Sequence, residues 1–326
     1  MPSGSWEPCR SSQPQSSSLL ATRQVAESRK LPLLKAVPHS SCPDNLTINV
    51  GAKTADGSAI TVEGCTETTL ASDTKTTLNA TGTRVVLKGK ITELYCNGTY
   101  DSNQLLTSLN VQGLTALQKL YCSNNQLPEL NVQGLNALQE LGCYNNQLPE
   151  LNVQGLTALK VLYCSGNKLP ELNVQGLTAL QVLYCSGNKL PELNVQGLTA
   201  LKRLYCSNNK LPELNVQGLT ALQVLYCSNN YLTVLDLQGC TSLKELDCYS
   251  NQLNAKAMTE LLNALPAREE SDRASAILYT EDTGEGEDNC KDYTQPEELK
   301  KAVEDAKSRN WKVLRLKNAS GDRVDI

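Results

Sequence analysis

Eight of the thirteen cysteines in this chain recur at a regular interval. After a first gap of 26 residues, each interval is 21 residues. The eight positions are Cys96, Cys122, Cys143, Cys164, Cys185, Cys206, Cys227 and Cys248. A fixed period marks one structural position repeated in successive units, whereas bridged cysteines would have to face one another. The spacing therefore predicts a repetitive architecture whose interior holds these side chains as reduced thiols, because free cysteine is small, apolar and often buried.

Each 21-residue unit carries the same apolar pattern, L-x-x-L-x-C-x-x-N-x-L. The unit that begins at Leu117 sets the register, and the following units begin at Leu138, Leu159, Leu180, Leu201, Leu222 and Leu243. This pattern is the signature of a leucine-rich repeat with cysteine in its sixth place. Seven matches in register predict a leucine-rich-repeat solenoid of the α/β repeat class. One coil alone leaves both of its flat faces exposed, so only stacking makes the array stable.

The alternation of side chains along a strand assigns the repeat positions to faces. Leu120 and Cys122 point into the coil, and Tyr121 points outward on a concave parallel sheet. The second half of the unit, Leu127–Val132, repeats the rhythm and predicts a second, weak sheet on the convex side. The recurrent asparagine lies where the chain turns, and a buried amide can satisfy both N–H and C=O groups there. We expect a structural asparagine ladder of Asn125, Asn146, Asn167, Asn188, Asn209, Asn230 and Asn251.

The sequence divides into four parts by composition. Residues 1–43 are rich in Ser, Pro and Gln and are predicted to be disordered, or to reflect a mis-called start codon. Residues 44–95 alternate apolar and polar side chains and form a β-rich N-terminal cap. Residues 96–253 form the solenoid, with the excess residues of its first unit in a protruding loop at Asn97–Gln104. Residues 254–326 form an α/β C-terminal cap.

The C-terminal cap is predicted to alternate helices and strands. Asn254 can cap a helix that ends at Pro266, and a second helix opens after Pro296. Short apolar runs at Ala276–Tyr279 and Trp311–Leu316 are typical of strands.

Composition narrows the classes of function. The net charge of −4 provides no basic field for nucleic acid, and no apolar stretch approaches the roughly 20 residues of a membrane span. The first 30 residues contain no apolar core of a signal peptide. The only histidine is His39, and no Cys-x-x-Cys occurs. We therefore expect no metal, no cofactor and no catalytic set, and a monomeric protein that is not an enzyme.

The positions that vary between units lie mainly on the outward face of the concave strands. The candidate ligand-binding residues are Tyr95, Tyr121, Tyr144, Tyr163, Tyr184, Tyr205, Tyr226, Tyr249, Lys119, Glu140, Val161, Val182, Arg203, Val224 and Glu245. Where the tyrosine is replaced, by Gly142 or Asp247, another follows two residues later and should keep an aromatic on that face in every unit. Exposed tyrosine is enriched at interface hot spots, which favours protein binding. Cross-strand packing that only stabilises the sheet is the alternative explanation.

The array resembles the bacterial leucine-rich-repeat proteins of treponemes and Bacteroidetes, which share the 21-residue unit. The lead-in Lys88–Cys96 and the tail segment Lys307–Val313 are also similar to theirs. The resemblance covers residues 44–316 and implies a secreted or cell-surface adhesion protein that attaches to a protein ligand. An intracellular scaffold or adaptor is the alternative, which the lack of a visible leader and the thiol-rich interior favour.

Overall fold

The computed structural model describes residues 33–38, 46–98, 104–281, 287–317 and 321–326. Most of the segment predicted to be disordered, the inner part of the predicted loop Asn97–Gln104, Cys9 and Cys42 lie outside these ranges. None of the helices in the described ranges is long and apolar enough to cross a membrane.

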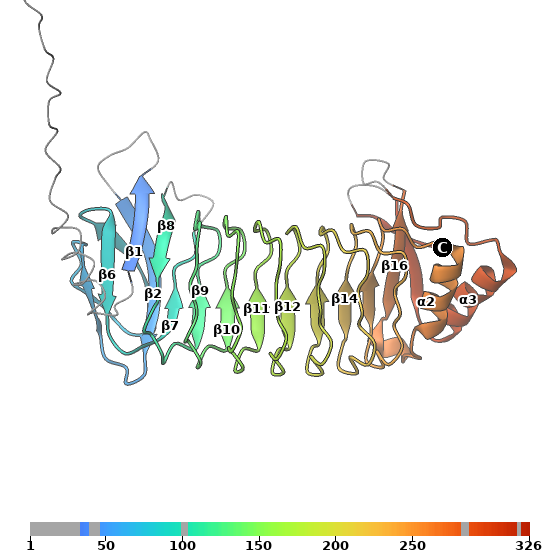
Figure 1. The fold of residues 1–326 in the computed structure, drawn as a ribbon, viewed down its shortest axis with the longest axis horizontal. Helices are drawn as coiled ribbons and strands as arrows, with labels where there is room; N and C mark the ends of the chain where they lie inside the picture. The colour runs from blue at the N-terminus through green and yellow to red at the C-terminus, as the bar shows by residue number, and fades with distance from the viewer. Residues whose placement is uncertain (1–32, 39–45, 99–103, 282–286, 318–320) are drawn as a thin grey trace, which may run out of the picture. The chain divides into compact units, whose positions relative to one another are not determined.

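The solenoid is a stack of coils, each of which contributes one three-residue strand to a parallel sheet (Figure 1). These strands are β9 (Lys119–Tyr121), β10 (Glu140–Gly142), β11 (Val161–Tyr163), β12 (Val182–Tyr184), β13 (Arg203–Tyr205), β14 (Val224–Tyr226) and β15 (Glu245–Asp247). The register pairs equivalent residues of successive units, such as Leu162 with Leu183 and Tyr163 with Tyr184. One 21-residue repeat of the sequence therefore corresponds to one coil of the solenoid.

The interior of each coil is built from the residues that the repeat pattern predicts. Leu180, Leu183 and Cys185 are completely buried, and so is Val195 in the second half of the same unit. Two successive turns close that half, with the N–H of Leu198 donating to the Val195 carbonyl at 3.2 Å. Burial of a leucine side chain contributes roughly 1.5–3 kcal/mol, and each coil buries several. The predicted leucine-rich-repeat solenoid is confirmed.

The second, weak convex sheet is not found. No strand occurs over 127–132 or over its counterparts in the later coils that the structure describes. In the first coil the counterpart 106–111 overlaps the strand β8 (Gln104–Asn110), which pairs with β1 (Leu33–Pro38) and not with the next coil. Adjacent coils are joined there by one backbone hydrogen bond, such as Lys189 N–H to the Leu169 carbonyl at 3.0 Å, and by glutamine side chains such as Gln175, whose amide donates to the Asn194 carbonyl. Five of the seven units carry a proline at this point, for example Pro191, which has no N–H to donate, so a ladder cannot run continuously through these units.

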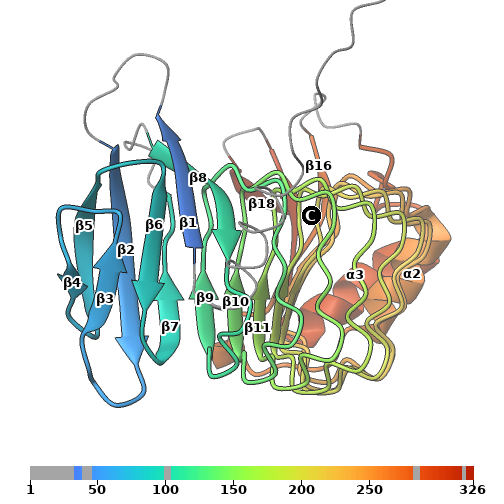
Figure 2. The same ribbon diagram turned by 60° about the vertical axis from the view of Figure 1, so that its left-hand side comes forward.

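The N-terminal cap consists of two sheet segments. Strands β2 (Leu46–Thr54), β5 (Thr74–Ala80) and β7 (Ile91–Tyr95) extend the solenoid sheet, in the order β9-β7-β2-β5. The second sheet has the order β4-β3-β6-β1-β8 (Figure 2). Its strands are β1 (Leu33–Pro38), β3 (Ile60–Glu63), β4 (Thr69–Leu70), β6 (Arg84–Lys88) and β8 (Gln104–Asn110). Buried side chains of both sheets belong to one hydrophobic cluster that continues into the solenoid.

The cap departs from the predicted boundaries at both ends. Strand β1 lies within the segment 1–43 that was predicted to be disordered, and it pairs antiparallel with both β6 and β8. Strand β8 lies within the part assigned to the solenoid. Both misassignments have the same cause, because β1 is stabilised by partners far away along the chain that its own polar surroundings do not reveal.

The C-terminal cap closes the other end of the solenoid sheet. Strands β16 (Ser275–Thr280) and β17 (Lys312–Leu316) add in parallel to β15, and β18 (Arg323–Asp325), which was not predicted, adds antiparallel. The predicted helices are α2 (Ala255–Ala264) and α3 (Glu297–Ser308), with the short 3₁₀ helix η1 (Glu270–Asp272) between them in the chain. Asn254 caps α2 by accepting the N–H of Ala257 at 2.9 Å. The two helices contact each other and lie beyond the last strands (Figure 1).

Candidate functional site: the concave face of the sheet

The outward side of the concave sheet carries two columns of side chains, one on each side of the buried leucine. One column runs from Lys119 to Glu245, and the other contains the tyrosines. The tyrosines are partly buried by their neighbours, whereas Arg203 and Glu245 are exposed. The structure therefore places the strand residues of the predicted site on one continuous face.

The tyrosines form two separate stacks. Tyr95 and Tyr121 are parallel, with ring centroids 5.4 Å apart and an interplanar angle of 6°. The second stack contains four rings, with centroid distances of 4.9 Å from Tyr163 to Tyr184, 4.0 Å from Tyr184 to Tyr205 and 4.5 Å from Tyr205 to Tyr226. Tilted and edge-on contacts of this kind stabilise neighbouring strands.

Gly142 separates the two stacks. A Cβ at this position would lie only 2.6 Å from Cδ1 of Tyr121, so the ring of Tyr121 leans over the glycine and buries it. The stack of Tyr95 and Tyr121 therefore requires glycine at position 142, since any side chain there would displace the Tyr121 ring.

The tyrosines that replace the missing rings do not continue the stacks. Tyr144 and Tyr249 follow the strands, and neither makes a ring contact with the tyrosines of the described strands. The Tyr144 hydroxyl instead accepts a long hydrogen bond from Asn124 Nδ2 at 3.4 Å. Side-chain alternation alone did not reveal this, because β10 ends at Gly142 and β15 at Asp247, two residues before these tyrosines.

Charged groups lie at the two ends of the face, and the exposed Arg203 lies between them on β13. At the N-terminal end, the hydroxyl of Tyr95 donates to Glu93 at 2.6 Å, and that of Tyr121 donates to Glu140. Glu140 also forms an ion pair with Lys119 at 3.4 Å. These contacts engage the hydroxyls of the first stack within the protein itself.

The C-terminal end of the face is acidic. The Tyr226 hydroxyl donates to Glu245 at 2.7 Å. Asp247 occupies the tyrosine position of its unit, and burial raises its pKa to about 6, with Arg323 opposing and Glu245 adding to the shift. A carboxyl group that is buried at a cost to its ionised form is a feature often found at functional sites.

Between these ends, beside Arg203, lies a surface of uncharged side chains, which we call the central concave patch: Val161, Tyr163, Val182, Tyr184 and Tyr205. Burial raises the pKa of Tyr163, so its hydroxyl stays protonated at neutral pH. Tyr163 and Tyr184 are partly exposed, and the chain continues past each of them with Cys, Ser and Gly.

The asparagine ladder lies behind the face and joins successive coils. Oδ1 of Asn188 accepts the N–H of Leu169 at 3.1 Å, and its Nδ2 donates to the carbonyls of Cys164 and Cys185 at 3.1 and 3.0 Å. Each amide thus bonds its own coil and the preceding one. Asn289, which the sequence analysis missed, takes the next place beyond Asn251, since its Oδ1 accepts the N–H of Leu253 at 2.8 Å. It lies outside the 21-residue period, so no repeat signal could identify it.

The cysteine ladder is buried and unbridged. All eight cysteines of the repeat are free and completely or almost completely buried. Burial raises the pKa of Cys143 and Cys185 to about 12, which keeps the thiol form at neutral pH. Of the cysteines outside the period, Cys65, Cys240 and Cys290 are free as well. Within the described ranges, no group of three or more His, Cys, Asp or Glu side chains is placed to hold a metal ion.

Comparison with known proteins identifies the repeats. Residues 220–263 match the family model "Leucine Rich repeats (2 copies)". No curated protein matches the sequence.

Several solved structures are similar to parts of the chain. InlJ of Listeria monocytogenes, whose functional domain includes a cysteine ladder, shares 27% identity over 64% of this chain and 52% of its own, with a TM-score of 0.43. YopM, a leucine-rich effector protein of Yersinia pestis, shares 27% identity over 54% and 44%, with a TM-score of 0.41. Internalin C2 of Listeria monocytogenes shares 26% identity over 52% and 77%, with a TM-score of 0.44. The chain spans about half the length of the first two.

None of these comparisons reaches the treponemal and Bacteroidetes group, so that finer resemblance stays a prediction. The matched repeats at 220–263 and the seven stacked coils in register agree with each other. The protein carries leucine-rich repeats, and its fold is a leucine-rich-repeat solenoid with an extended concave face, the surface that such solenoids use for protein interaction.

Proposed function

We propose that this protein is a non-enzymatic binding protein that recognises a protein ligand on the central concave patch, as a bacterial surface or secreted adhesion protein. The observation that carries the proposal is the second tyrosine stack. Three of its rings, Tyr163, Tyr184 and Tyr205, lie beside two valines on a surface without an acidic side chain of its own.

The side chains of the patch are of the kind that dominates protein interfaces. Tyrosine combines a large apolar ring with a polar tip and loses little conformational freedom on binding. The stack also holds the rings in place before a ligand arrives, which lowers the entropic cost of binding. Arg203 at the border of the patch adds the other residue type that is enriched at hot spots.

The two ends of the face would orient the ligand. The acidic pair Glu245 and Asp247 favours a basic side chain of the partner at the C-terminal end. At the N-terminal end, Lys119 and Glu140 neutralise each other at 3.4 Å and offer no net charge. Complementary charge of this kind contributes more to specificity and to the association rate than to affinity.

A photo-crosslinking amino acid placed at Tyr184 tests the site, with the same group at Tyr231 as the control. Tyr231 is 52% exposed and lies outside the concave strands. A protein captured from position 184 and not from position 231 would then be purified and its affinity measured. Capture that is equal at both positions would contradict the proposed site.

The purified partner allows a quantitative test with the triple variant Tyr163→Ser, Tyr184→Ser and Tyr205→Ser. We expect affinity to fall at least tenfold, about 1.4 kcal/mol, with the circular dichroism spectrum unchanged. Tyr231→Ser is the matched control and should bind as the wild type does. Unchanged affinity in the triple variant would mean that the binding site lies elsewhere on the protein. The tyrosines would then only stabilise the sheet.

One observation favours the second candidate, an intracellular scaffold or adaptor. Every cysteine in the described ranges is a free thiol, and free thiols are typical of reducing compartments. Fractionation of the native cells distinguishes the two candidates, because only the adhesion protein would be found in the medium or on the surface.

A further inference from the structure

Arg203 interrupts a row of valines on the concave face. The outward residue that opens each strand is valine in β11, β12 and β14 and arginine in β13. The sheet register places Arg203 between Val182 and Val224, and Tyr205 lies two residues further along the same strand. Arg203 is therefore the only charged outward residue on β11–β14.

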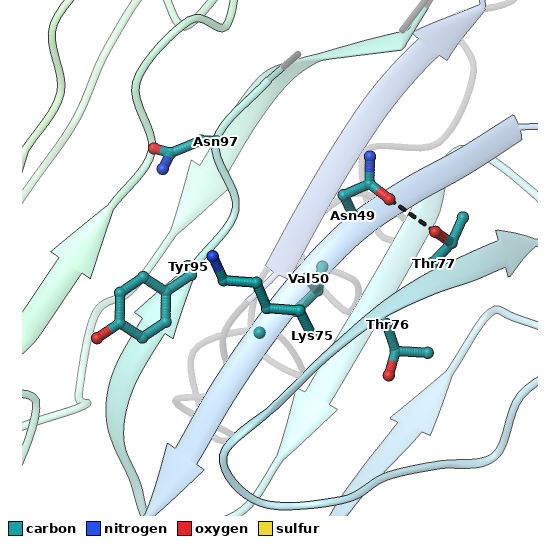
Figure 3. A pocket seen from close by; sticks show the side chains of 8 residues that line it. Asn49, Val50, Lys75, Thr76, Thr77, Tyr95 and Asn97 are labelled. Carbon is teal, nitrogen blue, oxygen red and sulfur yellow. Dashed lines mark hydrogen bonds between the residues drawn. The ribbon is translucent and has the colours of Figure 1, made fainter.

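Arg203 differs from other cations on the concave side in its surroundings. Lys119 pairs with Glu140 at 3.4 Å, and the ammonium of Lys75 lies 6.0 Å from the ring centroid of Tyr95 (Figure 3). Arg203 is exposed, and its guanidinium forms no ion pair and no hydrogen bond with the part of the chain that the structure describes. An acceptor group from a ligand could therefore reach it without displacing a partner.

A ligand that covers the central concave patch covers Arg203 as well. Tyr205 belongs to the same strand, and Val182 and Tyr184 lie on the neighbouring strand, about 4.8 Å away. Binding there removes water from the guanidinium, and an arginine that loses its water without gaining an acceptor opposes binding strongly. A tightly bound ligand must therefore bring an acceptor for Arg203.

A single guanidinium among apolar side chains matches one carboxylate. A carboxylate accepts two parallel hydrogen bonds from the fork of an arginine, and the attraction strengthens where neighbouring apolar groups exclude water. The nearest acidic residues of the face lie on β15, two strand steps or about 9.6 Å from β13, and the carboxylate of Glu245 there already accepts from the Tyr226 hydroxyl at 2.7 Å. A phosphate group would bring more negative charge, for which β11–β14 carry no second outward cation.

We propose that Arg203 is the specificity-determining residue of the concave face and pairs with an aspartate or glutamate side chain of the protein ligand. The apolar side chains around that acidic residue of the ligand pack on the central concave patch. This inference rests on the proposed function, because it names the group that the protein ligand presents to the patch. A ligand without the carboxylate would leave Arg203 unpaired and bind more weakly.

A phage-displayed library of random peptides, selected on the immobilised whole protein, supplies the probes. Peptides that bind the wild type but not the triple variant Tyr163→Ser, Tyr184→Ser and Tyr205→Ser are those that bind the central concave patch. We expect these patch-dependent peptides to share an Asp or a Glu. Arg203→Gln should weaken their binding at least tenfold. Lys202→Gln is the matched control, because Lys202 is exposed and adjacent in the chain but lies outside the patch, and it should leave the affinity unchanged.

A matched change in the peptide locates the contact. Replacing its shared Asp by Asn, or Glu by Gln, should weaken binding to the wild type at least tenfold and should have no further effect on Arg203→Gln, where the pair is already broken. Patch-dependent peptides that bind Arg203→Gln as tightly as the wild type would overturn this inference and leave the proposed function standing. Arg203 would then only interrupt an apolar row of the surface. If no selected peptide distinguishes the wild type from the triple variant, this inference and the proposed patch both fail.

Discussion

Along β9–β15, the inward residue is leucine in every strand, whereas the outward residues on either side of it change from unit to unit. Leu183 and its neighbours Val182 and Tyr184 illustrate the contrast within one strand. Leu183 is completely buried between identical coils, so a change of shape would disturb both neighbouring units. Val182 and Tyr184 contact the coils before and after them, but their outward side faces solvent. The buried position therefore accepts only leucine in these strands. The outward positions can differ between units, and a binding surface can form there.

The largest effect should come from breaking the inner face. We expect Leu183→Ala to lower the free energy of unfolding by about 2–5 kcal/mol, because it removes buried methyl groups and leaves a cavity. Val182→Ala, one residue away on the outer face, should cost less than about 1 kcal/mol. Denaturant titration of both variants measures the difference, and similar midpoints would refute the assignment of faces.

The asparagine ladder provides the next test. Asn188→Ala should cost about 1–3 kcal/mol, since it leaves the buried N–H of Leu169 without its acceptor and removes one of the two amide donors from the carbonyls of Cys164 and Cys185. Asn136→Ala is the matched control, because Asn136 is exposed and other units have threonine at that position. A loss of stability that is the same for both would show that the buried amide does not join the coils.

At the acidic end of the outer face, stability should depend on pH. Burial raises the pKa of Asp247 from 3.8 to about 6, so the folded protein holds this proton more tightly than the unfolded chain does. The resulting stabilisation is complete below about pH 3.8 and is lost as the pH rises through about 6. Above that pH the buried charge, which faces Glu245, Tyr226 and Arg323, is unfavourable.

Asp247→Asn should therefore stabilise the protein by about 1–2 kcal/mol at pH 7.5, and the gain should vanish toward pH 4. The range is below the full conversion of the shift because the side chain is partly exposed to water. Thermal unfolding of the wild type and the variant across this pH range measures it. A gain that does not change with pH would mean that the carboxylate is not perturbed in the folded state.

The smallest expected effect concerns the cysteine ladder. In the folded protein, iodoacetamide should leave the eight cysteines of the repeat unmodified, because they are buried thiols with raised pKa values. Without any reductant, all eight should react once the chain is unfolded in guanidinium chloride. Mass spectrometry counts the adducts, and the discovery of bridges between successive cysteines would contradict the stacking.

The sequence predicts the repeated part well and the unique parts less well. The Leu, Cys and Asn positions of each coil follow from a pattern that seven units repeat. The prediction of a convex sheet was wrong, because it used only the spacing of apolar residues. A proline such as Pro191 removes a backbone N–H donor that a strand needs. Tyr144 and Tyr249 were assigned to the concave face by alternation, but β10 and β15 end two residues before them, so their part in a binding site stays a prediction.

The sequence by itself determined the solenoid, because each coil buries its leucines against a neighbour of the same pattern, and local order therefore implies the stack. Only the tertiary structure decided how the stack ends. Strand β1 becomes ordered through pairing with β6 and β8, and Asn289 completes the asparagine ladder from a position 36 residues beyond Leu253. Likewise, Gly51 pairs with Tyr95, although 44 residues separate the two in the chain. Such contacts join segments that share no period, so they depend on the three-dimensional pairing of distant strands and leave no signal in either segment alone.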